Sequence, residues 1–133
     1  MSLILETLPQ QQDFYRQATL RYVAFYVDYV EQNRYRYELL SLEVDNILDA
    51  LRAANEYGMY TTYITGVLAV TSYLSASGGE KTAENILHEA LLIARSAQNH
   101  RDEARLLALL GDLTMRMGDY DDSEAQYRRG LSI

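Results

Sequence analysis

Few side chains in this sequence combine a type and a spacing that could support catalysis or hold a metal ion. Glu84 and His88 lie four residues apart, so on a helix they would share a face and could bind one metal ion together. A metal site needs a third and a fourth ligand, and none stands nearby, since His100 belongs to a separate turn. We therefore interpret these residues as ordinary surface side chains and expect no metal and no cofactor.

The acidic run Asp119, Asp121, Asp122 and Glu124 raises the question of cation binding. Its spacing lacks the regular alternation of a calcium-binding loop, and it stands where a helix is expected to begin. Carboxylates at that end offset the helix dipole. We interpret the run as helix capping.

Catalytic groupings are missing from the sequence. There is no cysteine, no G-x-S-x-G motif and no pairing of histidine with carboxylate on a plausible scaffold, so we expect no enzyme. The lack of cysteine also excludes disulfides, and a cytoplasmic location is expected. The first residues do not resemble a signal peptide, and no apolar run approaches the roughly 20 residues of a membrane span.

The charge balance argues against nucleic acid as a direct partner. Nineteen acidic and 12 basic residues give a net charge of −7, which repels a phosphate polyanion. An aromatic stripe near the N-terminus has two interpretations: core packing, which we favour, and an anchoring surface for a partner. Its members are Phe14, Tyr15, Tyr22, Phe25, Tyr26 and Tyr29.

The elements that position these residues are predicted to be six helices. Helix-breaking or capping residues occur at Pro9, Asn33, Gly58, Gly78-Gly79, Asn99 and Gly118. They divide the chain into segments 10–32, 36–57, 59–77, 80–98, 101–117 and 120–133. In the second segment Leu40, Val44, Ile47, Leu51 and Ala54 line one face. In the fifth, Leu106, Leu110, Leu113 and Met117 form one buried stripe, and Leu107, Ala108 and Gly111 a second.

A period of forty residues relates these segments to one another. Ile47 falls on Leu87 and Tyr127, Ala50 on Ala90 and Gly130, Leu51 on Leu91 and Leu131, and Ala54 on Ala94; Val27 falls on Val67 and Leu107, Val30 on Val70 and Leu110, and Gly78 on Gly118. Residues 59–77 are rich in β-branched and aromatic residues and would score as a strand alone. The period predicts a helix there, and three hairpins of equal length over 10–57, 59–98 and 101–133, in one domain of 133 residues.

Residues 104–133 resemble a tetratricopeptide repeat. Leu107, Leu110 and Gly111 occupy first-helix signature positions, Gly118-Asp119-Tyr120 the turn, and Tyr127 the large aromatic of the second helix. Ser123 and Gly130 stand where the family prefers alanine. The middle unit matches more loosely, through Gly78, Ala83, Leu87 and Ala90. The resemblance implies an all-α, right-handed superhelix of about three antiparallel hairpins.

A second resemblance covers about residues 35–133. Residues 43–58 look like the segment that follows the nucleotide-binding region in NB-ARC and maltose-activator-like signal-transduction ATPases. It implies that the chain is a piece of a longer bacterial regulator, without the ATPase core because no GxxxxGK[ST] loop is present. The last helix also stops early, with no polar capping helix to close the stack.

The tetratricopeptide resemblance places a partner-binding groove on the first helix of each hairpin. It selects Thr65, Leu68, Ser72, Arg105, Asp112 and Arg116. The last three recur at intervals of seven and four and share a face, where the arginines could grip a carboxylate or the backbone of a peptide. The alternative is a solvated face with an Asp112 to Arg116 pair worth about 0.3–0.5 kcal/mol.

These observations favour a scaffold or sensor module that binds a protein or peptide. One alternative is a regulatory domain that senses a small ligand or short peptide on the concave face. Another is self-assembly into a homo-oligomer through the uncapped ends of the array.

Overall fold

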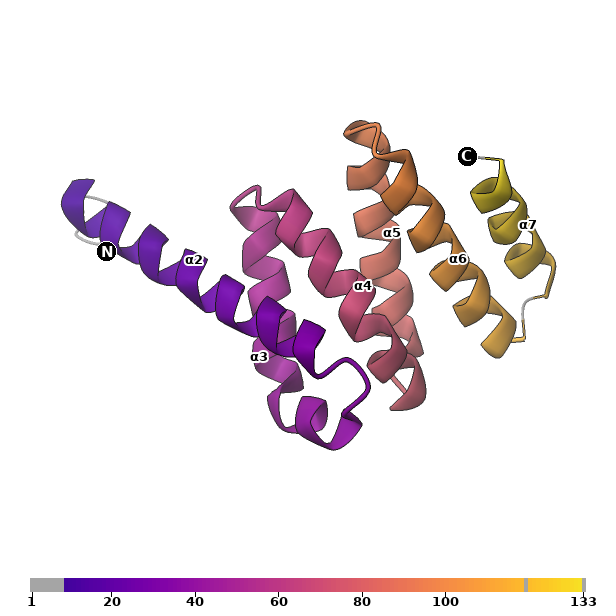
Figure 1. Cartoon of the computed structure of the whole chain (residues 1–133), viewed down its shortest axis with the longest axis horizontal. Helices are drawn as coiled ribbons and strands as arrows, with labels where there is room; N and C mark the ends of the chain where they lie inside the picture. The colour runs from indigo at the N-terminus through magenta and orange to yellow at the C-terminus, as the bar shows by residue number, and fades with distance from the viewer. Residues whose placement is uncertain (1–8, 119, 133) are drawn as a thin grey trace.

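The computed structural model describes residues 9–118 and 120–132, which form α-helices joined by short turns (Figure 1). The helices are α2 (Pro9–Gln32), α3 (Tyr37–Glu56), α4 (Tyr60–Ala76), α5 (Glu80–Ser96), α6 (His100–Arg116) and α7 (Tyr120–Leu131). The described residues contain no strand. The predicted all-α class is confirmed, and the predicted helix limits lie within two residues of these bounds.

The ambiguous segment 59–77 is helical, as the period predicted. Its helix, α4, contacts α2, α3, α5 and α6, and it carries no charged residue. Because neighbours cover it on several sides, α4 buries residues around most of its circumference, including Tyr63, Val67 and Val70. Enclosure explains the apolar and aromatic composition that made the segment look like a strand.

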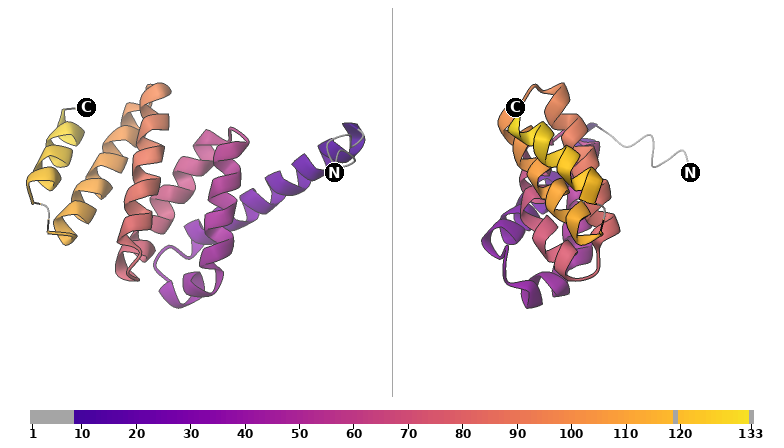
Figure 2. Two further views of the ribbon diagram at one scale, coloured as in Figure 1. Left: turned by 180° about the vertical axis from the view of Figure 1, so that it is seen from behind. Right: turned by 90° about the vertical axis from the view of Figure 1, so that its right-hand side faces the viewer.

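The helices follow one another along the long axis of the molecule, with α2 at one end and α7 at the other (Figures 1 and 2). Consecutive helices pack as neighbours throughout, and α2 also contacts α4, as α4 does α6. In contrast, α3 makes no such contact with α5. The first helices of successive hairpins are therefore closer together than the second helices are.

Positions related by forty residues are buried alike in the interior of the array. Val27, Val67 and Leu107 are buried, as are Val30, Val70 and Leu110, Ile47 and Leu87, Ala50 and Ala90, Leu51 and Leu91, and Ala54 and Ala94. In the last helix the match weakens, since Tyr127 and Gly130 are half-buried and Leu131 is 88% exposed. Leu51 and Leu91 have a following hairpin to pack against, whereas Leu131 lies on the outer helix.

The turns repeat every twenty residues in a single conformation. Gly58, Gly78, Gln98 and Gly118 each have a positive φ, of 72°, 87°, 55° and 85°. After Gly58, the Met59 N–H donates to the Ala54 carbonyl at 2.8 Å, and Gln98 is followed by the same 6→1 bond from Asn99 to Ala94 at 2.9 Å. These are Schellman motifs, which end a helix by satisfying its last carbonyls. Asn99 lies between α5 and α6, as predicted, and caps α6 by accepting from the Asp102 N–H.

Several signature residues lie where two helices pack closely. Ala83, Ala90 and Leu87 of α5 are fully buried. In the last hairpin a Cβ added to Gly111 would lie 3.1 Å from the Tyr127 ring, so the missing side chain makes room for the aromatic. In the middle unit, forty residues earlier, Thr71 stands at the position of Gly111, and Leu87, which is smaller than tyrosine, stands at the position of Tyr127. The Tyr120 side chain lies outside the described residues.

Four predictions about burial and length were wrong. The aromatic stripe is not core, since Phe14, Tyr15, Tyr22 and Phe25 are exposed and only Tyr26 and Tyr29 are half-buried. The Tyr22 and Tyr29 hydroxyls donate to backbone carbonyls of α3, and the first turns of α2 project past α3 (Figure 1). Ala108 and Met117 are exposed as well. The hairpins are also unequal, because α2 has 24 residues, α4, α5 and α6 have 17 each, and α7 has 12.

Candidate functional site

The six residues selected for partner binding all line shallow hollows on one side of the molecule. Thr65, Leu68 and Ser72 follow one face of α4, and Arg105, Asp112 and Arg116 follow one face of α6. We call this surface, defined by those six residues, the first-helix face. The structure brings five of them together around two adjoining hollows between α4 and α6, and Thr65 lines a separate hollow between α2 and α4.

The arginine hollow lies between α4, α6 and the turn that joins α2 to α3. It has a volume of about 250 Å³ and contains Arg34, Tyr35 and Arg105 on its polar side, with Leu68, Ser72, Ala108 and Leu109 completing the wall. No carboxylate is among the lining residues. Tyr35 is 74% exposed. Two guanidinium groups beside an accessible aromatic ring suit an anionic group carried on an apolar or aromatic side chain.

Arg105 has a weak partner. Its Nη1 lies 3.8 Å from Asp102 Oδ1, and the arginine side chain is 49% exposed. Asp102 is in addition held by Asn99, whose Nδ2 donates to its Oδ2 at 2.8 Å. An exposed ion pair of this length contributes at most about 1 kcal/mol. The Arg105 guanidinium is thus able to exchange Asp102 for a ligand carboxylate.

A second, smaller hollow of about 60 Å³ adjoins the first, sharing Ser72 and Leu109 with it. Asp112 and Arg116 lie at its rim. The intrahelical Asp112 to Arg116 pair that we considered does not form among the described residues, and Asp112 accepts a hydrogen bond from the Tyr127 hydroxyl of α7. This hydrogen bond raises the pKa of Tyr127, since ionisation would remove the donor and place a second negative charge beside Asp112.

The third hollow lies further along the first-helix face, between α2 and α4. It has a volume of about 230 Å³ and contains Thr65 with Thr61 and Thr62 on α4, and Asp28 with Glu31 on α2. This part is acidic, whereas the arginine hollow is basic. A bound segment would therefore be oriented by charge, with its negative part over Arg34 and Arg105.

Two further pairs of charged residues each form within a single helix. Glu84 accepts from Lys81 at 3.1 Å, and Glu124 accepts from Arg128 at 2.6 Å. Within the described residues no group of three or more potential ligands could hold a metal ion. Asp119 and the side chain of Asp121 lie outside the described residues, so their predicted capping role stays a prediction.

Sequence reasoning missed Arg34, Tyr35 and Leu109. Arg34 and Tyr35 belong to the α2–α3 turn, which the period did not connect with the groove of the following hairpins. The sequence feature that could have indicated a binding surface at this turn is the run of alternating arginine and tyrosine from Arg34 to Tyr37. Leu109 is half-buried between the two hollows, so helical periodicity alone would place it on neither face.

In the part of the chain that the structure covers, no helix combines the length and apolar character needed to cross a bilayer. Comparison of the chain with family models, with curated proteins and with solved structures finds no match in any of the three. The assignment of function therefore depends on the geometry of the first-helix face and on the resemblances in the sequence.

Proposed function

We propose that the chain is a tetratricopeptide-like α-solenoid that binds a protein or peptide on its first-helix face. The contact pattern supports the fold. Contacts join α2 to α4 and α4 to α6, whereas α3 does not contact α5, and this difference supports an array in which the first helices lie on the inner side. Similar burial at forty-residue spacing in α2, α4 and α6, and in α3 and α5, supports repeated units.

The observation that carries the proposed function is that five of the six selected residues line two adjoining hollows that contain three arginines. Arg34, Arg105 and Arg116 lie on this face of a chain whose net charge is −7. Arginine binds carboxylates through two parallel hydrogen bonds, and apolar wall residues supply contact area. The favoured partner is therefore a peptide or loop with an acidic residue next to an apolar or aromatic one.

The resemblance of residues 35–133 to the repeat region of NB-ARC and maltose-activator-like regulators supplies the setting. In this proposal the module serves as a scaffold or sensor within a bacterial cytoplasmic regulator of signalling or transcription. The module is proposed to act by binding a partner and not by catalysing a reaction.

The test is binding of acidic peptides to arginine variants. An array of labelled peptides, each containing an acidic residue beside an aromatic one, is screened by fluorescence anisotropy against the natural chain and against Arg105→Gln/Arg116→Gln. We expect the double variant to weaken the best peptide by about tenfold or more, because close charge pairs contribute about 1.5 kcal/mol or more each.

The matched control is Arg128→Gln/Arg129→Gln, which removes the same charge from α7 outside the hollows. Equal loss in both double variants would show that net charge, and not the first-helix face, governs binding. Saturable thermal stabilisation by a small metabolite, with no peptide bound, would favour the ligand-sensing alternative instead.

Self-assembly is a second candidate, favoured by the exposed aromatic stripe. Phe14, Tyr15 and Phe25 are each more than 60% exposed at one end of the array, and Leu131 is exposed at the other. Apolar residues clustered in this way mark interaction surfaces. Light scattering over a concentration series tests this candidate, with Phe14→Ser/Phe25→Ser as the variant expected to abolish any dimer. A mass equal to the monomer at every concentration would eliminate it.

A further inference from the structure

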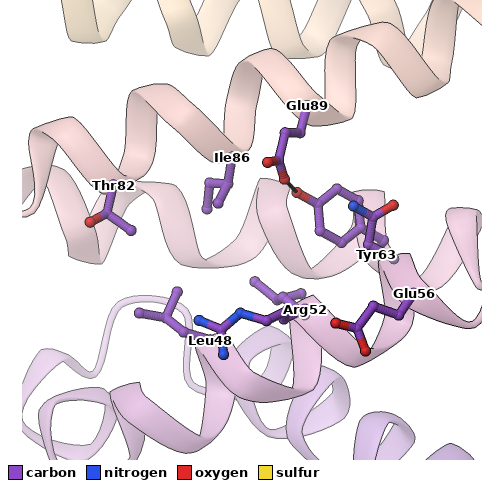
Figure 3. A pocket seen from close by; sticks show the side chains of 9 residues that line it. Leu48, Arg52, Glu56, Tyr63, Thr82, Ile86 and Glu89 are labelled. Carbon is purple, nitrogen blue, oxygen red and sulfur yellow. Dashed lines mark hydrogen bonds between the residues drawn. The ribbon is translucent and has the colours of Figure 1, made fainter.

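A second hollow surface lies on the side of the second helices. It has a volume of about 430 Å³ and runs between α3 and α5, with α4 as its floor (Figure 3). It exists because α3 and α5 do not touch, whereas both pack on α4. We call it the second-helix cleft and define it by Leu48, Arg52 and Glu56 of α3, Tyr63 of α4, and Ile86 and Glu89 of α5.

The cleft has an apolar bottom and side walls. Leu48 and Ile86 face each other across it in Figure 3, and Tyr63 closes the floor with only 2% of its surface exposed. The Tyr63 hydroxyl donates to Glu89 Oε2 at 2.9 Å, so this carboxylate is held at the edge of the cleft. Burial and Glu89 together raise the pKa of Tyr63, which keeps the hydroxyl a donor.

The rim of the cleft is negative. Its lining includes two carboxylates, Glu56 and Glu89, and one cation, Arg52. The two helices α3 and α5 as a whole contain eight carboxylates and three cationic side chains, and each of those cations already has a carboxylate partner. Arg52 pairs with Asp49 at 2.8 Å, Lys81 with Glu84 at 3.1 Å and Arg95 with Glu103 at 3.0 Å.

Two carboxylates of the rim remain for a ligand. Among the described residues Glu56 forms no ion pair, and Glu89 has the hydroxyl of Tyr63 but no cation. Facing acidic groups above an apolar floor attract a cationic group with an aliphatic stem, because the stem can bury itself while the charge stays at the rim.

We propose that the second-helix cleft docks a basic amphipathic helix of a partner protein. The two flanking helices form a groove with α4 beneath it, which suits a partner helix laid along the groove. One apolar side chain of that helix enters between Leu48 and Ile86. Arginine or lysine residues about one turn away on either side reach Glu56 and Glu89. The occupant is a protein segment and not a nucleic acid, since the rim is acidic.

This inference goes beyond the proposed function because it uses the opposite helices and the opposite charge. The arginine hollow of the first-helix face selects an acidic segment, whereas the second-helix cleft selects a basic one. The module is therefore two-sided and able to hold two partners of opposite charge at once.

The experiment uses a fluorescein-labelled 15-residue helical peptide of leucine and arginine, with leucines at positions i, i+3, i+4 and i+7, and a mirror peptide with glutamate for arginine. Anisotropy titration of the full chain is expected to show saturable binding of the arginine peptide alone. The affinity should fall as salt rises from 50 to 300 mM, because exposed charge pairs are screened. Equal binding of both peptides, or of neither, would overturn the proposal.

Variants locate the binding site. Glu56→Gln/Glu89→Gln is expected to weaken the arginine peptide about fivefold to tenfold, and glutamine at 89 still accepts from Tyr63. The control Glu38→Gln/Glu80→Gln removes the same charge from the same two helices outside the cleft. An equal effect in both pairs would refute the site.

The Arg105→Gln/Arg116→Gln variant separates this inference from the proposed function. It should bind the arginine peptide normally, because both substitutions lie on the first-helix face. Loss of arginine-peptide binding in this variant would place the peptide there and contradict the cleft as its site.

Discussion

Gln98 holds a backbone conformation that glycine holds in the three equivalent turns. Its φ is 55°, against 72° at Gly58, 87° at Gly78 and 85° at Gly118. A side chain in this region costs about 1 kcal/mol or more through contact of Cβ with the backbone. We expect Gln98→Gly to stabilise the chain by about 0.5–1 kcal/mol, because relief of strain exceeds the extra entropy of glycine in the unfolded chain.

Urea unfolding followed by circular dichroism measures this change. Gly58→Ala is the reciprocal variant, since a Cβ there meets nothing within 4 Å and only the backbone conformation is strained. It should destabilise by about 1 kcal/mol. A destabilising Gln98→Gly would show that the glutamine side chain makes a compensating contact.

The hydrogen bond from Tyr63 to Glu89 makes stability depend on alkaline pH. The pKa of Tyr63 is raised in the folded chain above its unfolded value of about 10, so folding favours the protonated phenol. The contribution to stability is complete below pH 10 and is lost as the pH rises toward the folded pKa. Over that range the loss is about 1.4 kcal/mol per pH unit.

Tyr63→Phe removes the titrating hydroxyl, so the variant should lose less stability than the natural chain as the pH rises above 10. At pH 7 the variant is expected to be less stable by about 1 kcal/mol because one hydrogen bond is missing. The difference from the natural chain should shrink between pH 10 and 11, as measured by urea unfolding at each pH. Other tyrosines with raised pKa values, such as Tyr127, are present in both proteins and cancel in the comparison. Parallel pH profiles of the two proteins would contradict the assignment.

At the scale of the element, α4 packs closely because Gly66 lacks a side chain. A Cβ at this position would overlap Leu51 Cδ2 of α3 and lie 3.3 Å from Val27 Cγ2 of α2. Leu51 is buried, so its Cδ2 can move away only by giving up packing contacts in the core or by turning toward the second-helix cleft that it also lines. We expect Gly66→Ala to destabilise by about 1–2 kcal/mol, since the overlap outweighs the roughly 1 kcal/mol gain in helix propensity.

A double-mutant cycle with Leu51→Val tests the cause. Valine lacks both Cδ atoms, so in that background Gly66→Ala should become neutral or stabilising. The free energies of unfolding of all four proteins, taken from urea denaturation, give the interaction energy. An unchanged cost in the valine background would mean that the overlap with Leu51 is not the source.

The helices were predictable because each is bounded by a short-range signal. Gly58, Gly78 and Gly118 end helices through one turn geometry, and the forty-residue period corrected the strand-like composition of Tyr60 to Thr65. Exposure was less predictable. The rings of Phe14 and Phe25 are apolar and periodic, as core residues are, and only the absence of a covering helix in the described chain exposes them.

The candidate site was predictable in part, for the same reason. A repeat fixes which face of α4 and α6 its residues occupy, and in the structure Leu68, Ser72 and Arg105 line one hollow. Arg34 was not predicted, because it belongs to the α2–α3 turn, and the path of that turn depends on tertiary packing. The second-helix cleft was not foreseen, because it arises from the separation of α3 and α5, and no local pattern encodes that distance.

At the scale of the whole molecule, contacts are confined to neighbouring helices. Among the described elements, α4 contacts α2, α3, α5 and α6, whereas α7 contacts α6 alone. In such an array stability is approximately a sum over units and the interfaces between them. Local opening should therefore occur most easily at the ends and least easily in the middle.

Hydrogen exchange measured by mass spectrometry should reveal this gradient. We expect amides of α4 to exchange slowest, and those of α7 and of the first turns of α2 to exchange fastest, because few buried contacts hold the outer segments. Leu107→Ala, which removes a fully buried side chain of α6, should accelerate exchange in α6 and α7 while α2 and α3 change little. If every helix exchanged at one rate, and Leu107→Ala accelerated all of them equally, the chain would be a single cooperative unit, and the additive repeat description would be wrong.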